Sequence, residues 1–239
     1  MSLLIYLPEC SSTNDEILHF LPMPSNQDTI SVYTFNQTKG RGQYGNVWEN
    51  FPDQNLAFSM AVKAFKIPIS DSIFNFRTAN ILRDFIAKLT QTEVQVKWPN
   101  DIILNNKKVS GMLIEKKTAE NESYYIIGIG VNILQTNFEH LPKAGSILTQ
   151  TKRNFDLKEW AEAMQQYFET HLFHENKEEE ILSEYNQHLF RKEMISVFEI
   201  KGVRQNGIIK KVTPDGRLWI DLENDGLDSF YHKEIELLY

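Results

Sequence analysis

Residues 37–48 form a glycine-rich segment that several nucleotide-binding folds could use, each in a different structural context. The segment reads Gln-Thr-Lys-Gly-Arg-Gly-Gln-Tyr-Gly-Asn-Val-Trp. Glycine has no Cβ to oppose positive φ or close backbone approach, so N–H groups in such a segment can turn toward an anion. Lys39 and Arg41 add positive charge, and arginine can bind a phosphate or carboxylate through two hydrogen bonds. The segment predicts an anion site, with a flexible turn carrying incidental charges as the alternative.

Residues 40–45 also match G-x-G-x-x-G, which in dinucleotide-binding folds leads directly into a helix. The residues after Gly45 lack helical periodicity and include Pro52, so we expect no helix there. A P-loop sequence is absent, and so are the His-Arg-Asp and Asp-Phe-Gly motifs that accompany the glycine loop of protein kinases. The sequence therefore excludes these three phosphate-binding folds.

The composition is typical of a folded, soluble protein. With 239 residues and 41% hydrophobic content, the chain suits one large domain or a main domain with a small appendage. No stretch is apolar enough to span a membrane, and the single cysteine, Cys10, forms no internal disulfide, so we expect a cytoplasmic protein. A net charge of −7 argues against extended nucleic-acid binding.

Hydrophobic periodicity predicts an α+β fold. We expect a short helix from about residue 12 to 20, a long helix over 71–89 and a helical region from 156 to about 192. Strands are expected at 1–8, 30–35, 55–62, 94–98, 102–104, 109–115 and 124–133. Beyond residue 194, short β-rich runs separated by the turns 214–216 and 224–226 predict a small barrel. We place the boundary between domains 1–190 and 191–239.

Two groups of residues are candidates for chemistry. Lys97 ends a strand before Trp98 and Pro99, where a partly buried ammonium needs an anionic partner, although a solvent-exposed lysine is the simpler interpretation. Gly128, Gly130 and Asn132 share one face of a strand, which leaves the backbone open to a ligand or to a closely packed helix.

The sequence offers no clear nucleophile and no zinc site, since His171 and His174 have no third ligand nearby. Cations, glycines and amides suit phosphoryl or nucleotidyl transfer, in which positioning and charge stabilisation dominate.

Taken together, these motifs closely resemble the biotin protein ligase family. The matching elements are Ser12-Thr13-Asn14, Gln37-x-x-Gly40-Arg41-Gly42, Trp48, Asn55-Leu56, Lys97-Trp98-Pro99-Asn100-Asp101, Gly111 and Gly128-x-Gly130-x-Asn132, in order across residues 6–135. The resemblance implies a mixed β-sheet catalytic domain flanked by helices, as in class II synthetases and biotin–lipoate ligases, and an SH3-like C-terminal domain.

The resemblance also implies a two-step reaction and a set of site residues. Biotin and Mg·ATP give biotinyl-5′-AMP and pyrophosphate, and the acyl group then passes to a lysine of a biotin carboxyl carrier protein. The implied biotin-binding residues are Ser12, Thr13, Asn14, Gln37, Gly40, Arg41, Gly42, Gln43, Gly111, Gly128 and Gly130. Lys97 and Arg41 are the implied catalytic residues, and Trp48, Lys97 and Asn132 the implied nucleotide-binding residues. No metal ligand is assigned.

The chain departs from this family at two loop positions. Gln43 and Asn46 stand where many relatives carry arginine, so we expect biotinyl-AMP to escape faster. The first motif begins at Ser12, which leaves no space for the N-terminal DNA-binding domain of some relatives, so no DNA partner is expected.

Other assignments stay open. A lipoate or octanoate ligase or transferase of the same superfamily is the nearest alternative, and a non-catalytic protein-binding module is a further one. A homodimer formed through edge strands is possible.

Overall fold

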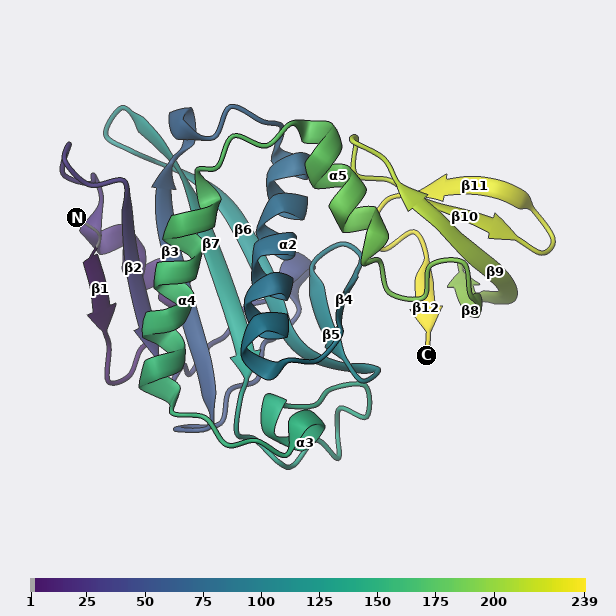
Figure 1. The fold of residues 1–239 in the computed structure, drawn as a ribbon, viewed down its shortest axis with the longest axis horizontal. Coiled ribbons are helices and arrows are strands. Elements are labelled where there is room, and N and C mark those ends of the chain that lie inside the picture. The colour runs from purple at the N-terminus through teal and green to yellow at the C-terminus, as the bar shows by residue number, and fades with distance from the viewer. Residues whose placement is uncertain (1–2) are drawn as a thin grey trace.

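The computed structural model describes residues 3–239, which fold into a large and a small β-sheet joined by helices (Figure 1). The strands of the large sheet, in spatial order, are β1 (Leu3–Tyr6), β2 (Thr29–Thr34), β3 (Asn55–Lys63), β7 (Glu122–Asn132), β6 (Lys107–Ala119), β5 (Asp101–Leu104) and β4 (Val94–Lys97). Only β1 and β2 run parallel, and the other neighbours are antiparallel. The predicted mixed sheet is confirmed, while Met1 and Ser2 of the expected first strand lie outside the described residues.

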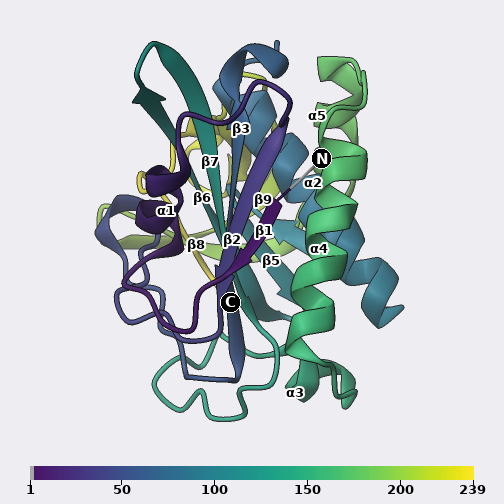
Figure 2. The ribbon, with the colours of Figure 1, turned by 90° about the vertical axis from the view of Figure 1, so that its left-hand side faces the viewer.

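The long helices cover one face of the large sheet and leave the other face to loops and one short helix. These helices are α2 (Asp71–Thr90), α4 (Leu157–Leu172) and α5 (Glu178–Gln187). Figure 2 shows them on one side of the sheet, with the short helix α1 (Thr13–Glu16) on the other. Alternation along β7 follows this division, because Ile127, Ile129 and Val131 join the main core while Gly128 and Gly130 line a cavity on the opposite face.

The region expected to be helical from 156 to about 192 contains two helices with a break between them. Arg77 of α2 binds the chain at this break: its guanidinium donates to the backbone carbonyls of His171, in the last turn of α4, and of His174, just beyond it. Those carbonyls are thereby satisfied without a further helical turn. A short helix, α3 (Ile147–Thr151), and three single 3₁₀ turns (Ile17–Phe20, Gln43–Gly45 and Ala64–Lys66) complete the helical elements of residues 3–239.

The second sheet is antiparallel, as the turns in the tail predict. In spatial order its strands are β11 (Gly226–Phe230), β10 (Leu218–Leu222), β9 (Val203–Val212), β8 (Ile195–Ile200) and β12 (Glu236–Leu238). Because β11 pairs only with β10 and β12 only with β8, no strand pair within residues 3–239 closes the sheet into a barrel. Phe198, Ile209 and Ile220 of this sheet belong to the same buried cluster as the helices and the large sheet.

No helix in the described part of the chain is long and apolar enough to cross a membrane.

Candidate active site

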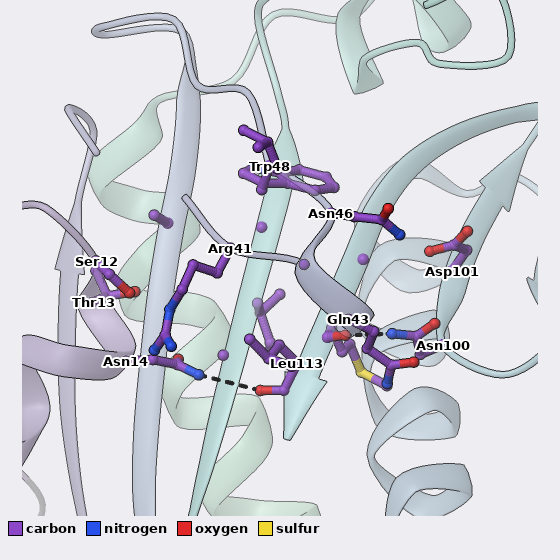
Figure 3. Close-up of a pocket in the computed structure, with 18 of the residues that line it drawn as sticks. Ser12, Thr13, Asn14, Arg41, Gln43, Asn46, Trp48, Asn100, Asp101 and Leu113 are labelled. Atoms are coloured by element: carbon purple, nitrogen blue, oxygen red, sulfur yellow. Dashed lines mark hydrogen bonds between the residues drawn. The ribbon is translucent and has the colours of Figure 1, made fainter. Parts of the chain in front are cut away.

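A cavity on the open face of the large sheet gathers most of the predicted site residues (Figure 3). We call it the first cavity, and the predicted residues that line it are Ser12, Thr13, Asn14, Gln37, Arg41, Gly42, Gln43, Trp48, Gly111, Gly128 and Gly130. A second cavity beside it is lined by the predicted residues Trp48, Lys97 and Asn132. Gly40 lines neither cavity. The structure therefore divides the predicted set into two adjoining groups.

Backbone pairing brings the start of α1 to the glycine-rich segment. The N–H groups of Thr38 and Lys39 donate to the carbonyls of Cys10 and Ser11, at 2.9 and 2.8 Å. The Ser12 side chain makes no capping hydrogen bond with α1 and instead lines the first cavity.

Buried polar side chains form a network at this end of the first cavity. The Thr13 N–H donates to Gln37 Oε1 at 2.9 Å, and Ser59 Oγ donates to Asn14 Oδ1 at 2.6 Å. Asn14 Nδ2 in turn donates to Glu115 Oε2 at 2.8 Å. Sequence reasoning missed Ser59, whose signal is a hydroxyl in the otherwise apolar run of β3 (Leu56–Val62). Such a network fixes donors and acceptors in place for a polar ligand.

The glycine-rich segment forms a small hairpin that we call the glycine loop (residues 40–48). The Trp48 N–H donates to the Gly40 carbonyl at 3.0 Å, and the Gly42 N–H donates to the Asn46 carbonyl at 2.7 Å. A Cβ on Gly40 would lie 2.3 Å from the Trp48 carbonyl oxygen, so this crossing requires glycine. No helix follows the loop before the turn at Ala64, which confirms that the dinucleotide fingerprint does not apply.

The indole of Trp48 lies on the glycines of β6 and β7. A Cβ on Gly130 would come within 2.3 Å of the indole, and one on Gly111 within 3.2 Å. A Cβ on Gly128 would instead meet the Asn14 carboxamide at 2.2 Å. Because these strand positions carry no side chain, they leave room for the Trp48 indole and the Asn14 carboxamide. Trp48 also lines both cavities, so its ring forms part of the wall between them.

Arg41 is held by carboxylates. Its Nη2 lies 2.6 Å from Asp15 Oδ1 and 3.3 Å from Glu115 Oε2. Burial raises the pKa of Glu115, but hydrogen bonds from Asn14 and Lys117 and the charge of Arg41 outweigh it, so the pKa of Glu115 is lowered. Both carboxylates contact Nη2, so an anionic ligand that binds this nitrogen competes with Asp15 and Glu115.

Asp101 and Lys108 stand where the two cavities meet. Both line both cavities, and Lys108 Nζ lies 2.7 Å from Asp101 Oδ1 and 5.5 Å from the centroid of the Trp48 ring. Lys97 Nζ lies 3.6 Å from Asp101 Oδ2, which supplies the anionic partner expected for this lysine. Lys97 faces the second cavity and does not line the first.

The sequence did not identify Lys108, because this residue lies between the predicted strands 102–104 and 109–115 and a bulge changes the face that it occupies. Ile102 pairs with Ser110 but Ile103 pairs with Lys108, so Val109 is an extra residue in β6. Simple alternation places residues 108 and 111 on opposite faces, whereas the extra residue brings the Lys108 side chain over Gly111.

Asn132 and His232 complete the boundaries of the site. Asn132 is buried, donates from Nδ2 to the Gly145 carbonyl at 3.1 Å and lines the second cavity. His232 comes from the turn after β11 and lines the first cavity. The sequence did not predict that a residue of the C-terminal region 191–239 contributes to the site. Within residues 3–239 no cluster of three or more His, Cys, Asp or Glu side chains is arranged to hold a metal ion.

Residues 6–132 match the Biotin/lipoate A/B protein ligase family, and the chain belongs to that family. It is 30% identical over 136 residues to Biotin--protein ligase 2 of Arabidopsis thaliana, a match that covers 54% of this chain and 40% of that protein. It is 26% identical over 144 residues to Biotin--[acetyl-CoA-carboxylase] ligase of Mycobacterium tuberculosis, covering 59% of this chain and 53% of that one. The match thus spans about half the length of these relatives or less.

Biotin protein ligase from Aquifex aeolicus, solved in complex with biotin and ATP, has a similar structure. The TM-score is 0.79 at 22% identity, and the similarity covers 98% of both chains. At this identity the similarity shows a shared fold, and it extends over the second sheet as well as the first.

Proposed function

We propose that this protein is an ATP-dependent ligase that activates biotin as biotinyl-5′-AMP and transfers it to a lysine of a biotin carboxyl carrier protein. The observation that carries the proposal is the meeting of two cavities at Lys108 and Asp101, one lined by buried amides and glycines and the other by Lys97 and Asn132. A reaction between two bound substrates needs such a junction, because their reacting atoms have to be held together. The names of the relatives and of the similar solved structure supply the substrate class.

In this proposal the first cavity holds biotin. Ser12, Thr13 and Gln37, with the backbone near Arg41, hydrogen-bond the ureido group. The thiophene ring lies along β7 at Gly128 and Gly130. That position requires the Trp48 indole to move away from Gly130, because the indole fills the space where a Cβ would project.

Three cations serve the first step. The biotin carboxylate oxygen attacks the α-phosphorus of ATP, and the bond to the pyrophosphate leaving group breaks. Arg41, Lys97 and Lys108 stabilise the negative charge on the carboxylate and the α-phosphate as this happens. Arg41 first exchanges Asp15 for the substrate anion, and Lys108 approaches from the junction.

The nucleotide occupies the second cavity, with Trp48 covering it and Asn132 helping to hold it. Mg²⁺ enters with ATP, because this ion is commonly held by substrate phosphates and only one or two carboxylates. Asp101 is the one carboxylate within residues 3–239 that lines both cavities, and it fits that requirement.

In the second step the amine of the acceptor lysine attacks the acyl carbon, and AMP leaves. We assign this chemistry to a catalytic unit of residues 1–190, with residues 191–239 as a smaller second unit.

The exchange of radiolabelled pyrophosphate into ATP tests the proposed first step. Exchange that depends on biotin is the expected result, and exchange that depends on lipoate instead would assign the chain to the other branch of its family. Absence of exchange with either acid, in a folded protein, would overturn the ligase proposal and favour a binding module.

A further inference from the structure

A turn of the second sheet touches the tip of the glycine loop. The turn spans Tyr231–Glu234, closed by the Glu234 N–H donating to the Tyr231 carbonyl at 3.1 Å. Its two central residues are His232 and Lys233. The His232 ring centroid lies 4.9 Å from that of Tyr44, within the range of favourable aromatic pairs. Lys233 Nζ donates to the Tyr44 carbonyl at 3.2 Å and lies 4.9 Å from the centre of the same ring.

Little else holds the loop tip. Tyr44 is 64% exposed, and no atom lies within 4 Å of the position that a Cβ on Gly45 would take. Within residues 3–239, the hydrogen bond from Lys233 is the only one that joins residues 43–45 to a part of the chain outside the glycine loop. The position of the tip therefore depends on the turn.

Both partners in this contact adopt backbone conformations that favour glycine. Tyr44 has φ 55°, and Lys233, the third residue of the turn, has φ 74°. Side chains other than glycine, asparagine and aspartate are uncommon in this region and cost energy there. Glycine at position 233 would relieve the turn but would remove the ammonium that contacts Tyr44.

His232 is suited to aromatic contact on two sides. Its ring also lies 5.7 Å from the Trp98 ring, nearly edge-on, and its Nδ1 is buried without a hydrogen-bond partner. Burial, with the charges of Lys97, Lys233 and Lys108 outweighing that of Asp101, lowers the pKa of His232. The ring is therefore neutral at pH 7 and acts as an aromatic surface.

We propose that His232 and Lys233 are positioning residues, which hold the Tyr44 tip so that the glycine loop stays at the mouth of the first cavity. Both contact the loop tip, and His232 in addition lines the first cavity. The contact itself is independent of the proposed ligase function, and only its effect on catalysis rests on that function.

Amide hydrogen exchange of the ligand-free protein tests the contact directly. In His232→Ala we expect residues 42–47 to exchange about two- to tenfold faster, the range that corresponds to loss of one aromatic pair. His232→Phe keeps an aromatic ring beside Tyr44 and should exchange like the wild type. Lys210→Ala, which removes a surface lysine of the same sheet, is the matched control. Equal exchange in His232→Ala, Lys233→Ala and Lys210→Ala would overturn the proposal, and so would a failure of phenylalanine to rescue.

A double-mutant cycle separates a positioning role from a general loss of stability. If His232 acts through Tyr44, adding His232→Ala to Tyr44→Ala should raise exchange of the loop no further. In steady-state assays, His232→Ala should raise KM for biotin two- to tenfold and leave kcat nearly unchanged, and His232→Phe should restore KM. If the loop exchanges faster in His232→Ala but the wild-type protein does not adenylate biotin, the positioning contact is supported and the ligase proposal is refuted. If the wild type is an active ligase and His232→Ala has faster loop exchange but a normal KM for biotin, the proposed effect on catalysis is refuted.

Discussion

At the scale of single residues, two carboxylates determine how much positive charge Arg41 presents to the first cavity. Asp15 and Glu115 both bind Arg41, so the guanidinium does not face the cavity as a free cation. We infer that an incoming carboxylate replaces Asp15 rather than Glu115, because Glu115 has further hydrogen bonds from Asn14 and Lys117.

Glu115 makes stability depend on pH in the acid range. Its pKa in the folded protein is lowered relative to the unfolded chain, so its contribution is present at neutral pH and is lost as pH falls through the folded-state pKa. The free energy of unfolding, measured with urea between pH 7 and pH 3, should fall less steeply in Glu115→Gln than in the wild type. Parallel pH profiles for the two proteins would contradict this assignment.

Lys97 and Lys108 should each be needed for adenylate formation. Replacing either by alanine removes a cation from the junction of the cavities, and loss of one charge-stabilising donor typically lowers kcat by about 10²–10³-fold. Biotin-dependent pyrophosphate exchange measures the effect, with unchanged circular dichroism as the check on folding. Lys158→Ala, which removes an exposed lysine on α4, is the control. Normal exchange in Lys97→Ala would remove that residue from the proposed mechanism.

Gln43 should weaken retention of the adenylate. It lines the first cavity at the loop tip, where an arginine could add a cation for the phosphate. We expect Gln43→Arg to release biotinyl-AMP more slowly than the wild type. Trapping of free adenylate during turnover measures the release, and Gln43→Met controls for side-chain length. Equal release in all three proteins would show that this position does not hold the phosphate.

The sequence predicted one set of polar residues and glycines that the structure gathers at the first cavity, but it did not predict how the charged side chains pair. Ser12, Gln37 and Gly130 could be placed because their motifs occur in a known order along the chain. Lys108 could not, since a bulge reverses the face it occupies. The pairing of Arg41 with Glu115 joins residues 74 positions apart, and no local pattern reports such a contact.

At the scale of the elements, the hairpin β5–β6 fixes which residues of β6 reach the cavities. Asn105 and Asn106 connect the strands and have φ of 49° and 60°. Asparagine tolerates this left-handed region, and two such residues are typical of a tight hairpin turn. The sequence predicted strands on both sides of this turn, at 102–104 and 109–115, and the structure extends them to Asp101–Leu104 and Lys107–Ala119. The break between α4 and α5 was missed because Arg77, which binds the carbonyls there, lies in another helix.

A β-branched residue in that turn should destabilise the protein. We expect Asn106→Val to lower the free energy of unfolding by about 1–2 kcal/mol, the cost of a left-handed conformation for a residue with a branched Cβ. Asn106→Gly should match or exceed the wild type, because glycine adopts positive φ without strain. Urea unfolding measures both variants. A loss of stability in Asn106→Gly as large as that in Asn106→Val would show that the Asn106 side chain, and not the backbone conformation, matters.

At the scale of the whole molecule, one buried cluster links the two sheets. Phe198 of β8 is fully buried in the same cluster as Leu82 of α2 and Val96 of β4. The sequence separated the tail from the rest by its change in composition and turn spacing. It could not show that the tail shares this cluster or that His232 lines the first cavity, because both depend on contacts between distant parts of the chain.

Truncation of Phe198 should therefore destabilise the protein as a unit. Phe198→Ala is expected to lower the free energy of unfolding by about 3–5 kcal/mol, as is usual for a large buried aromatic side chain. Tryptophan fluorescence and far-ultraviolet circular dichroism should follow one coincident transition with a lowered midpoint. A separate early transition in the variant would instead indicate that residues 191–239 unfold independently.

The contact between Tyr44 and Lys233 joins residues 189 positions apart. At a synthesis rate of about 5–20 residues per second, the ribosome adds Lys233 roughly 10–40 s after Tyr44. The nascent chain therefore carries the glycine loop without its partner for this interval, even if the large sheet has already paired. The first cavity acquires its wall at His232 only after translation has passed residue 232, so an unfinished chain cannot hold its loop as the folded protein does.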